Sequence, residues 1–526
     1  MRRPKSILAA GAAVLALGLV PAGAAAQSDQ SASNSASSTA TNNSSTTQAA
    51  AQDQSSGSSC SYGCGGSGQY QSLSQDASTE QNASSGAAAN QEAINANVPV
   101  TVGSGNESGD SSASQELDNS ASSEASNDAT TTQEAAQQQS SDSSCYAGCG
   151  GSGQAQKLEQ DADTVQNAES GAEANQQAIN ANVPVTIGYG NESGDSSASQ
   201  DLSNEADSEA SNDATTKQEA AQQQSSDSSC HAGCGGSGQY QELEQDAETK
   251  QKAKSGAEAN QKAINANVPV VIGWGNESGS SSADQKLSND ADSTATNKAK
   301  TKQSAGQEQS SESGCKYGCG GSGQAQKLGQ RASTEQDAYS WAEANQDAIN
   351  ANVPVVIGWY NDSGDSEANQ RLYNSASSEA SNDATTTQEA AQSQEAESHG
   401  KAGSGGAGQF QGLWQDASTE QNAGSEAVAN QTAENVNSPV TVNKGKDKDD
   451  GKDHAKDKDD GKDYDKDRYG KDRYGKDRCD DKDHGKDHYG KDRGDDKHKK
   501  GHKSSKSKRP KHDKYKKGKG SKKSHR

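Results

Sequence analysis

Charged and uncharged residues alternate strictly in two kinds of segment that recur along the chain. We call these segments A arms (73–97, 158–182, 243–267, 328–352 and 413–437) and B arms (30–54, 115–139, 200–224, 285–309 and 370–394). In the third A arm, every second residue from Leu243 to Ala263 is uncharged, and the Glu, Asp and Lys residues occupy the positions between. The ten arms hold 49 charged residues, and all 49 fall on a single parity within their arm.

A strict period of two predicts β-strands, because successive side chains of a strand point to opposite faces. The Ala, Gln, Glu and Lys composition favours helix instead, but a helix would spread these charges around its circumference. We therefore predict strands with one neutral and one charged face. Each arm spans about 80 Å at 3.3 Å per residue, which is longer than most strands. The arms should either bend at corners, for which Gly86, Gly171 and Gly256 are candidates, or form a flat fibrous array.

The arms belong to a tandem repeat of 85 residues, which the pairs Cys60/Cys64 and Cys145/Cys149 mark out. The period gives the following organisation: 1–26 signal peptide, 27–59 partial repeat with a B arm only, 60–144, 145–229, 230–314 and 315–399 full repeats, 400–443 degenerate Cys-free partial repeat, 444–496 Lys/Asp polyampholyte linker, and 497–526 basic tail. Stacked repeats predict a repetitive all-β fold, either a β-solenoid or an extended β-array, with low-complexity loops and a disordered C-terminal tail. The alternative is a largely disordered chain.

The apolar run that follows each A arm is the only candidate for a conventional core. Ile94, Val98, Val100 and Val102 share one parity, so stacking the repeats should bury a continuous ridge of their equivalents. Otherwise, only 27% of the residues are hydrophobic and 4% aromatic, which leaves little to wall a catalytic pocket. No catalytic motif is present, and we expect no enzymatic activity.

The N-terminal segment has the features of a secretory signal peptide. Arg2, Arg3 and Lys5 precede a short apolar run that ends in three alanines at 24–26. We expect a secreted protein that is extracellular or associated with the cell surface. No later stretch of the sequence is apolar enough to span a membrane.

Export favours disulfides among the repeat cysteines. A bridge could close each small loop or link equivalent cysteines of stacked repeats, and the sequence leaves both open. The odd cysteine, Cys479, is a candidate for an intermolecular cross-link. The candidate disulfide residues are Cys60, Cys64, Cys145, Cys149, Cys230, Cys234, Cys315 and Cys319.

A Gly-Asn-Glu-Ser-Gly-Asp sequence beginning at Gly105 predicts a tight turn. Its carboxylates, Glu107 and Asp110, are too few for a full calcium shell, so any calcium binding would be weak, and we predict no cofactor or dedicated metal site. Aromatic residues precede the turn in later repeats and could stack on a ligand such as a sugar ring. These residues are Tyr189, Trp274 and Trp359.

The net charge of −24 conceals two opposite parts. Residues 1–443 carry 18 Lys/Arg and 54 Asp/Glu, whereas residues 444–526 carry 32 Lys/Arg and 20 Asp, a net of +12. The tail should bind polyanions such as a wall polymer, an acidic polysaccharide or extracellular nucleic acid. We expect a structural protein of a cell surface, coat or extracellular matrix that self-associates through its repeats. The alternatives are a repeat array that binds carbohydrate or divalent cations, and a disordered matrix or biofilm filler.

Overall fold

The computed structural model describes residues 25–63, 65–148, 150–233, 235–318, 320–400 and 405–443. Two five-stranded parallel sheets contain most of these residues. Sheet A holds the B arms, as β1 (Ala26–Tyr62), β5 (Ser111–Ala147), β9 (Ser196–Ala232), β13 (Ser281–Tyr317) and β17 (Ser366–Gly400). Sheet B holds the A arms, as β2 (Gly68–Asn97), β6 (Gly153–Asn182), β10 (Gly238–Asn267), β14 (Gly323–Asn352) and β18 (Gly408–Asn437).

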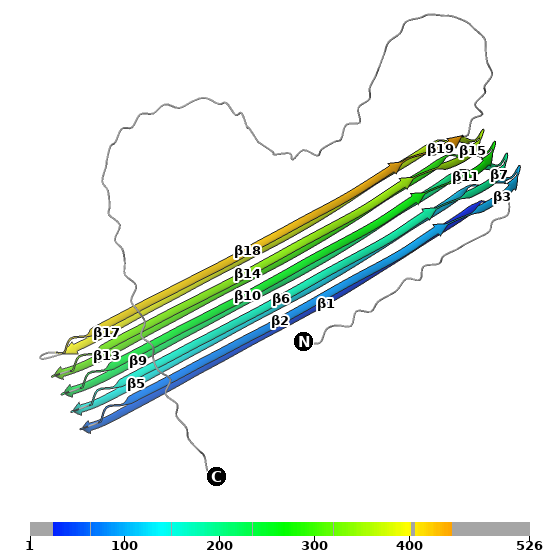
Figure 1. Ribbon diagram of the computed structural model, residues 1–526. Helices are drawn as coiled ribbons and strands as arrows, with labels where there is room; N and C mark the ends of the chain where they lie inside the picture. Colours follow the sequence, from blue (N-terminus) through cyan, green and yellow to red (C-terminus); the bar gives the residue numbers. More distant parts are fainter. Residues whose placement is uncertain are drawn as a thin grey trace, which may run out of the picture. The chain divides into compact units, whose positions relative to one another are not determined.

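Two small parallel sheets lie at one end of the long strands, where each A arm turns into the next B arm. Sheet C contains β3 (Val100–Ser104), β7 (Val185–Tyr189), β11 (Val270–Trp274), β15 (Val355–Trp359) and β19 (Val440–Asn443). Sheet D contains β4 (Glu107–Ser108), β8 (Glu192–Ser193), β12 (Glu277–Ser278) and β16 (Asp362–Ser363). Figure 1 shows the long strands lying side by side, with sheet C at one end.

Each 85-residue repeat forms one coil of a flattened solenoid. A B arm runs in one direction in sheet A, and the following A arm returns in sheet B (Figure 1). Equivalent residues of successive coils lie opposite each other without any slip, as in Leu117↔Leu202 and Ala257↔Ala342. The predicted all-β solenoid with 85-residue repeats is therefore confirmed. The signal peptide (up to residue 24) and the predicted disordered tail (444–526) lie outside the described residues.

The neutral faces of the two sheets form the interior. Every uncharged position identified in the third A arm, from Leu243 to Ala263, is buried. Among the described residues, all buried polar side chains are Gln, Asn, Ser or Thr, and none carries a charge. The alternation therefore has a simple cause: a charge between the sheets would lose its hydration without gaining a partner.

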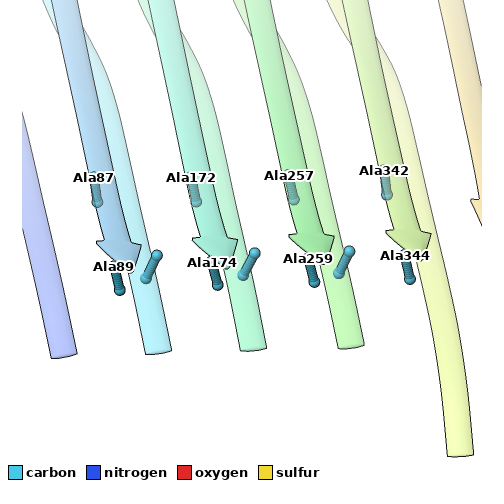
Figure 2. Close-up of a cluster of buried hydrophobic side chains, with 11 residues drawn as sticks. Ala87, Ala89, Ala172, Ala174, Ala257, Ala259, Ala342 and Ala344 are labelled. Carbon is cyan, nitrogen blue, oxygen red and sulfur yellow. The ribbon is translucent and has the colours of Figure 1, made fainter. Parts of the chain in front are cut away.

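Alanine columns fill the middle of this interior. Ala87 and Ala89 of β2 are followed at the same positions by their equivalents in β6, β10 and β14 (Figure 2), and the facing strands contribute Ala121, Ala206 and Ala291. Side chains this small allow two sheets to pack closely over their whole length. Leucines supply the largest buried side chains, in separate columns that include Leu158, Leu243 and Leu328.

Amide side chains join the columns along and across the stack. Gln245 Nε2 donates to Gln160 Oε1 of the neighbouring coil at 2.7 Å and to the Ser304 carbonyl of the facing sheet at 3.3 Å. Asn265 similarly donates to Asn350 Oδ1 along its own sheet and to two carbonyls of sheet A. These bonds satisfy buried polar groups and fix the register of the two sheets relative to each other.

Of the two forms predicted for the arms, the described strands show the flat one and not the one with corners. The long strands extend for 30, 35 or 37 residues, and Gly86 and Gly171 lie within unbroken strands. Gly256 has a different role, because a Cβ added there would lie 2.2 Å from Nε1 of Trp341, whose ring covers it.

The predicted apolar ridge is also not the core. Val102 is 68% exposed and Ile187, Ile272 and Ile357 are 37–40% exposed, so this column lies on the outer surface. The reason lies in the parity: Ile94 and Val98 continue the charged face of the A arm, not the neutral one. The buried members of sheet C lie one residue earlier than the exposed isoleucines and are Thr186, Val271 and Val356.

The parity rule predicts opposite outcomes for the same substitution on adjacent residues. Ala257→Lys places an ammonium group between the sheets, and we expect it to cost at least about 3 kcal/mol of folding free energy. Glu258→Lys places the same group on the outer face beside Glu173 and Glu343, so stability should stay within about 0.5 kcal/mol of the parent or rise slightly. Thermal unfolding followed by circular dichroism compares the two. Equal losses for both variants would contradict the assignment of the interior.

Candidate functional site

The outer faces carry columns of charge, because exact stacking places each charged residue beside its equivalents. Many neighbours share a sign, as at Glu124↔Glu209 and Asp128↔Asp213. Lysines of the third repeat relieve part of this repulsion: Lys286 Nζ lies 2.9 Å from Asp201 Oδ2, and Lys298 lies beside Asp213. The exposed pairs are individually weak, but each opposite-sign pair replaces a repulsive one.

Asp207 of β9 shows the strongest effect of this crowding. Burial, followed by the charge of Glu205 and then of Asp292 and Asp290, raises the pKa of Asp207 from 3.8 to about 6. Burial and neighbouring carboxylates likewise raise the pKa of Asp292. Ionised carboxylates in this cluster therefore oppose folding at neutral pH.

At the sheet C end, the predicted tight turn is present. Gly105, Gly190 and Gly275 have φ values of 65°, 58° and 61°, and Tyr360 takes the same position with φ 59°. The turn carboxylates contact the next coil, since Asp110 Oδ1 accepts the Asp195 N–H at 3.0 Å. Among the described residues, no group of three or more His, Cys, Asp or Glu is arranged to hold a metal ion.

The three turn aromatics form a stack along the solenoid axis. The Trp274 ring lies 5.3 Å from that of Trp359 with an interplanar angle of 20°, and 6.1 Å from that of Tyr189. Trp274 thus has a ring neighbour in each adjacent coil, while Trp274 and Tyr189 remain 42% and 62% exposed. Their role as ligand-stacking residues stays a prediction. Next to them lies the exposed column of Val102, Ile187, Ile272 and Ile357, which our sequence reasoning had placed in the core.

At the opposite end, the first cysteine of each loop belongs to a long strand. Cys60, Cys145, Cys230 and Cys315 lie opposite one another in successive strands of sheet A. Cys145 and Cys230 each take part in a disulfide bond. The loop connectivity stays a prediction, because Cys64, Cys149, Cys234, Cys319 and the tail residue Cys479 lie outside the described residues.

Loop residues add a second column of rings at this end. The Tyr146 and His231 rings stack at 4.9 Å, and Tyr62 and Tyr317 extend the column on either side at 5.7 and 6.1 Å. Tyr146 and His231 directly follow the first cysteine of their loops, whereas Tyr62 and Tyr317 come one residue later, so only the exact register of the coils predicts that the four rings touch.

The two ends of the stack are the most unusual surfaces of the described region. At one end, which we call the first-coil end, β1 and β2 are edge strands. At the other, the last-coil end, β17 and β18 are edge strands in the same sheets. No described strand or helix covers either edge. Solenoids usually end in capping segments, and edge strands usually carry charge or proline to prevent pairing with other chains.

The edge strand β1 lacks this protection. It contains two charged residues, Asp29 and Asp53, in 37, and it contains neither lysine nor proline. At the last-coil end, residues on both faces of β18 are exposed, including the inner-face alanines Ala423 and Ala427. At the first-coil end, the side chain of Gln69 in β2 is only 6% exposed, and its Nε2 has no hydrogen-bond partner among the described residues.

Comparison with protein-family models, curated proteins and solved structures finds no match for this chain. None of the described segments is a helix with the length and apolar character needed to cross a membrane. The functional interpretation therefore depends on the geometry of the stack itself.

The carboxylate cluster predicts that acid stabilises this fold. The folded pKa of Asp207, about 6, lies above the ordinary value of 3.8, so the folded state binds the proton more tightly. The penalty of ionisation is present at pH 7, declines as the pH falls through about 6, and is gone near pH 4. The melting temperature should therefore rise between pH 7 and pH 4. Asp207→Asn should raise it at pH 7 and have no effect at pH 4.

Glu116→Gln serves as the matched control, since Glu116 lies on the same outer face of sheet A and outside the Asp207 cluster. A melting temperature that falls steadily on acidification, with no gain from Asp207→Asn at pH 7, would contradict this account.

Proposed function

We propose that this chain is a secreted structural protein of a cell surface, coat or extracellular matrix, which self-associates through its stacked acidic β-repeats and attaches through its cationic tail. The observation that carries the proposal is the pair of unprotected sheet edges. They present strands of 37 and 30 residues that have no neighbouring strand on one side within the described part of the chain. Long edges of this kind are templates for pairing with another chain.

The properties of the described repeats also suit a structural role. Each coil packs against its neighbours through the same small and amide side chains, so the stack has the same cross-section throughout. Hydrogen-bonded amide columns and close alanine packing are the features that give cross-β assemblies their resistance to unfolding. The charged outer faces keep the stack hydrated and oppose lateral aggregation.

The binding-array alternative has less support. The Trp274 ring already has ring neighbours in Tyr189 and Trp359, and the Asp110 carboxylate already accepts a backbone N–H. A disordered filler is disfavoured for the described region, where nearly every residue of the repeats belongs to a strand.

Self-association is tested by raising the concentration of the purified chain after removal of the signal segment. We expect sedimentation to show species larger than a single chain, and electron microscopy to show unbranched filaments. Fibre diffraction from these filaments should give the spacing of about 4.7–4.9 Å between strands. A monodisperse monomer at millimolar concentration, unchanged after aging, would overturn self-association.

The tail is tested separately, because its residues lie outside the described region. Residues 497–526 contain 15 Lys/Arg and a single Asp, so deleting them should abolish binding to a polyanion such as heparin or DNA at low salt. Binding of the full chain should weaken steeply as salt rises. Deleting 444–496 instead is the matched control, because that segment holds 17 Lys/Arg against 19 Asp. Equal polyanion affinity for the two deletion variants would remove the tail from the proposal.

A further inference from the structure

We infer that copies of this chain join head to tail, with β1 and β2 of one copy continuing sheets A and B beyond β17 and β18 of another in the same 85-residue register. This inference rests on the proposed self-association and specifies its partner, its surfaces and its direction.

The first support is the order in which the strands pack. Strands of the two sheets alternate along the stack, so that each A arm contacts the B arms before and after it, as β2 contacts β1 and β5. The described coils begin with a B arm, β1, and end with an A arm, β18. The inner face of β18 therefore lacks the B arm that covers every other A arm. The β1 strand of a second copy is the element that continues this order.

The second support is the match between the inner faces of the two ends. The 15 inward positions of β2, from Gln69 to Asn97, carry the same residue types as those of β18, from Gln409 to Asn437. In β1 and β17, 12 of 17 inward positions are identical, and the other five differ only among Ala, Ser and Leu. Every alanine and amide column would therefore continue across the junction.

The third support is the direction of the glutamine columns. In the column that starts at Gln69, each residue donates its amide to the coil before it, from Gln154→Gln69 at 3.1 Å to Gln409→Gln324 at 3.1 Å. The column thus ends with an unpaired buried donor at Gln69 and an acceptor oxygen at Gln409. Head-to-tail contact brings these two together, whereas joining two first-coil ends would bring two donors together.

Charge also favours this junction. Continuing the register places Asp29 beside Asn369 and Asp53 beside Ser393, and every charged residue of β17 would meet an uncharged residue of β1. Inside the chain, β5 and β9 have like charges opposite each other at several positions, such as Glu134↔Glu219. The β2 and β18 pairing would create Asp76 beside Asp416 and Glu80 beside Glu420. The first of these repeats a pairing that the chain already contains at Asp76↔Asp161.

The junction also offers contacts that the free ends lack. Leu413 is 53% exposed at the end of the leucine column that Leu73 begins, and it would become covered. Phe410 and Tyr70 are exposed on the outer face and would become direct neighbours across the junction. Within the chain, each of them lies beside an alanine instead, Ala325 and Ala155. Aromatic pairs on neighbouring strands stabilise the pairing of those strands.

The test blocks each end by proline at positions whose backbone N–H points away from the stack. The N–H of Ala26 in β1 donates to the Asp110 carbonyl, just before β5, and that of Gly153 in β6 donates to the Ser67 carbonyl, just before β2. Because N–H directions alternate along a strand, the N–H groups of Ser37 in β1 and Ser78 in β2 point away from the stack. At the other end, the N–H of Ser281 donates to the Asp365 carbonyl and that of Gly408 to the Ser322 carbonyl. The N–H groups of Ala380 in β17 and Ala423 in β18 therefore point away from the stack. Proline is tolerated at such edge positions because no hydrogen bond of the single chain is lost.

The full chain is prepared in two forms. The head-blocked variant carries Ser37→Pro and Ser78→Pro, and the tail-blocked variant carries Ala380→Pro and Ala423→Pro. Ser37→Ala with Ser78→Ala, and Ala380→Ser with Ala423→Ser, are the matched controls, which should polymerise like the parent. Circular dichroism first confirms that each blocked variant keeps the β-sheet spectrum and a melting temperature within a few degrees of the parent.

The expected result is that each blocked variant alone stays monomeric, and that an equimolar mixture forms dimers and nothing larger by analytical ultracentrifugation. One variant still has a free first-coil end and the other a free last-coil end, so a single junction can form. Dimers in either variant alone would show joining of identical ends and overturn the inferred direction. Filaments in both blocked variants would show assembly through other surfaces, which keeps self-association but overturns the junction. A parent chain that stays monomeric overturns the proposed function itself.

Discussion

The cost of placing a charge between two close-packed sheets is the constraint on which this structure depends. Every inward position of the described arms is uncharged, and the inner residues are small or are amides that bond both along and across the stack. Because those residues recur every 85 positions, the stack tolerates no slip: moving one coil by a single residue would bring Glu258 or its equivalents into the interior. Large apolar side chains are scarce in the interior. The register of the coils is instead specified by the exclusion of charge and by hydrogen bonds between equivalent amide side chains.

Much of this fold could be read from the sequence because it depends on periodicity. The alternation from Leu243 to Ala263 predicts the strands and their buried face, and the 85-residue spacing of the cysteines predicts that equivalent residues stack. The apolar run does not form the core that its hydrophobic character predicts, because the parity of Ile94 places it on the charged face of the arm. The length of the strands could not be predicted from the length of typical strands. Here two continuous sheets pack against each other along their whole length, so no bend is needed to bury the neutral faces. Contacts such as Tyr146 with His231 required the register itself.

The candidate site was harder to anticipate, because no motif marks it. The edges become meaningful only once the strand order shows that a B arm begins the stack and an A arm ends it. The sequence did contain a signal in the low charge of β1, with Asp29 and Asp53 alone in 37 residues. The long edge strands, the closely matched inner faces at the two ends and the charged exterior are the features on which we base the proposal that the unit extends in one direction. A cationic tail on such a unit would bring it to anionic surfaces.

The central claim, exact stacking of equivalent residues from successive repeats, is tested most directly by spin labels on the outer face. Labels at Glu173→Cys and Glu258→Cys, in a chain carrying Cys479→Ser and with its repeat disulfides kept oxidised, would lie on adjacent strands about 4.8 Å apart. Electron paramagnetic resonance of the monomer at low concentration should then show strong dipolar and exchange broadening, and the pair Glu173→Cys with Lys262→Cys should show less. Sharp, uncoupled spectra for the first pair would contradict the stacked repeat and the interpretation built on it.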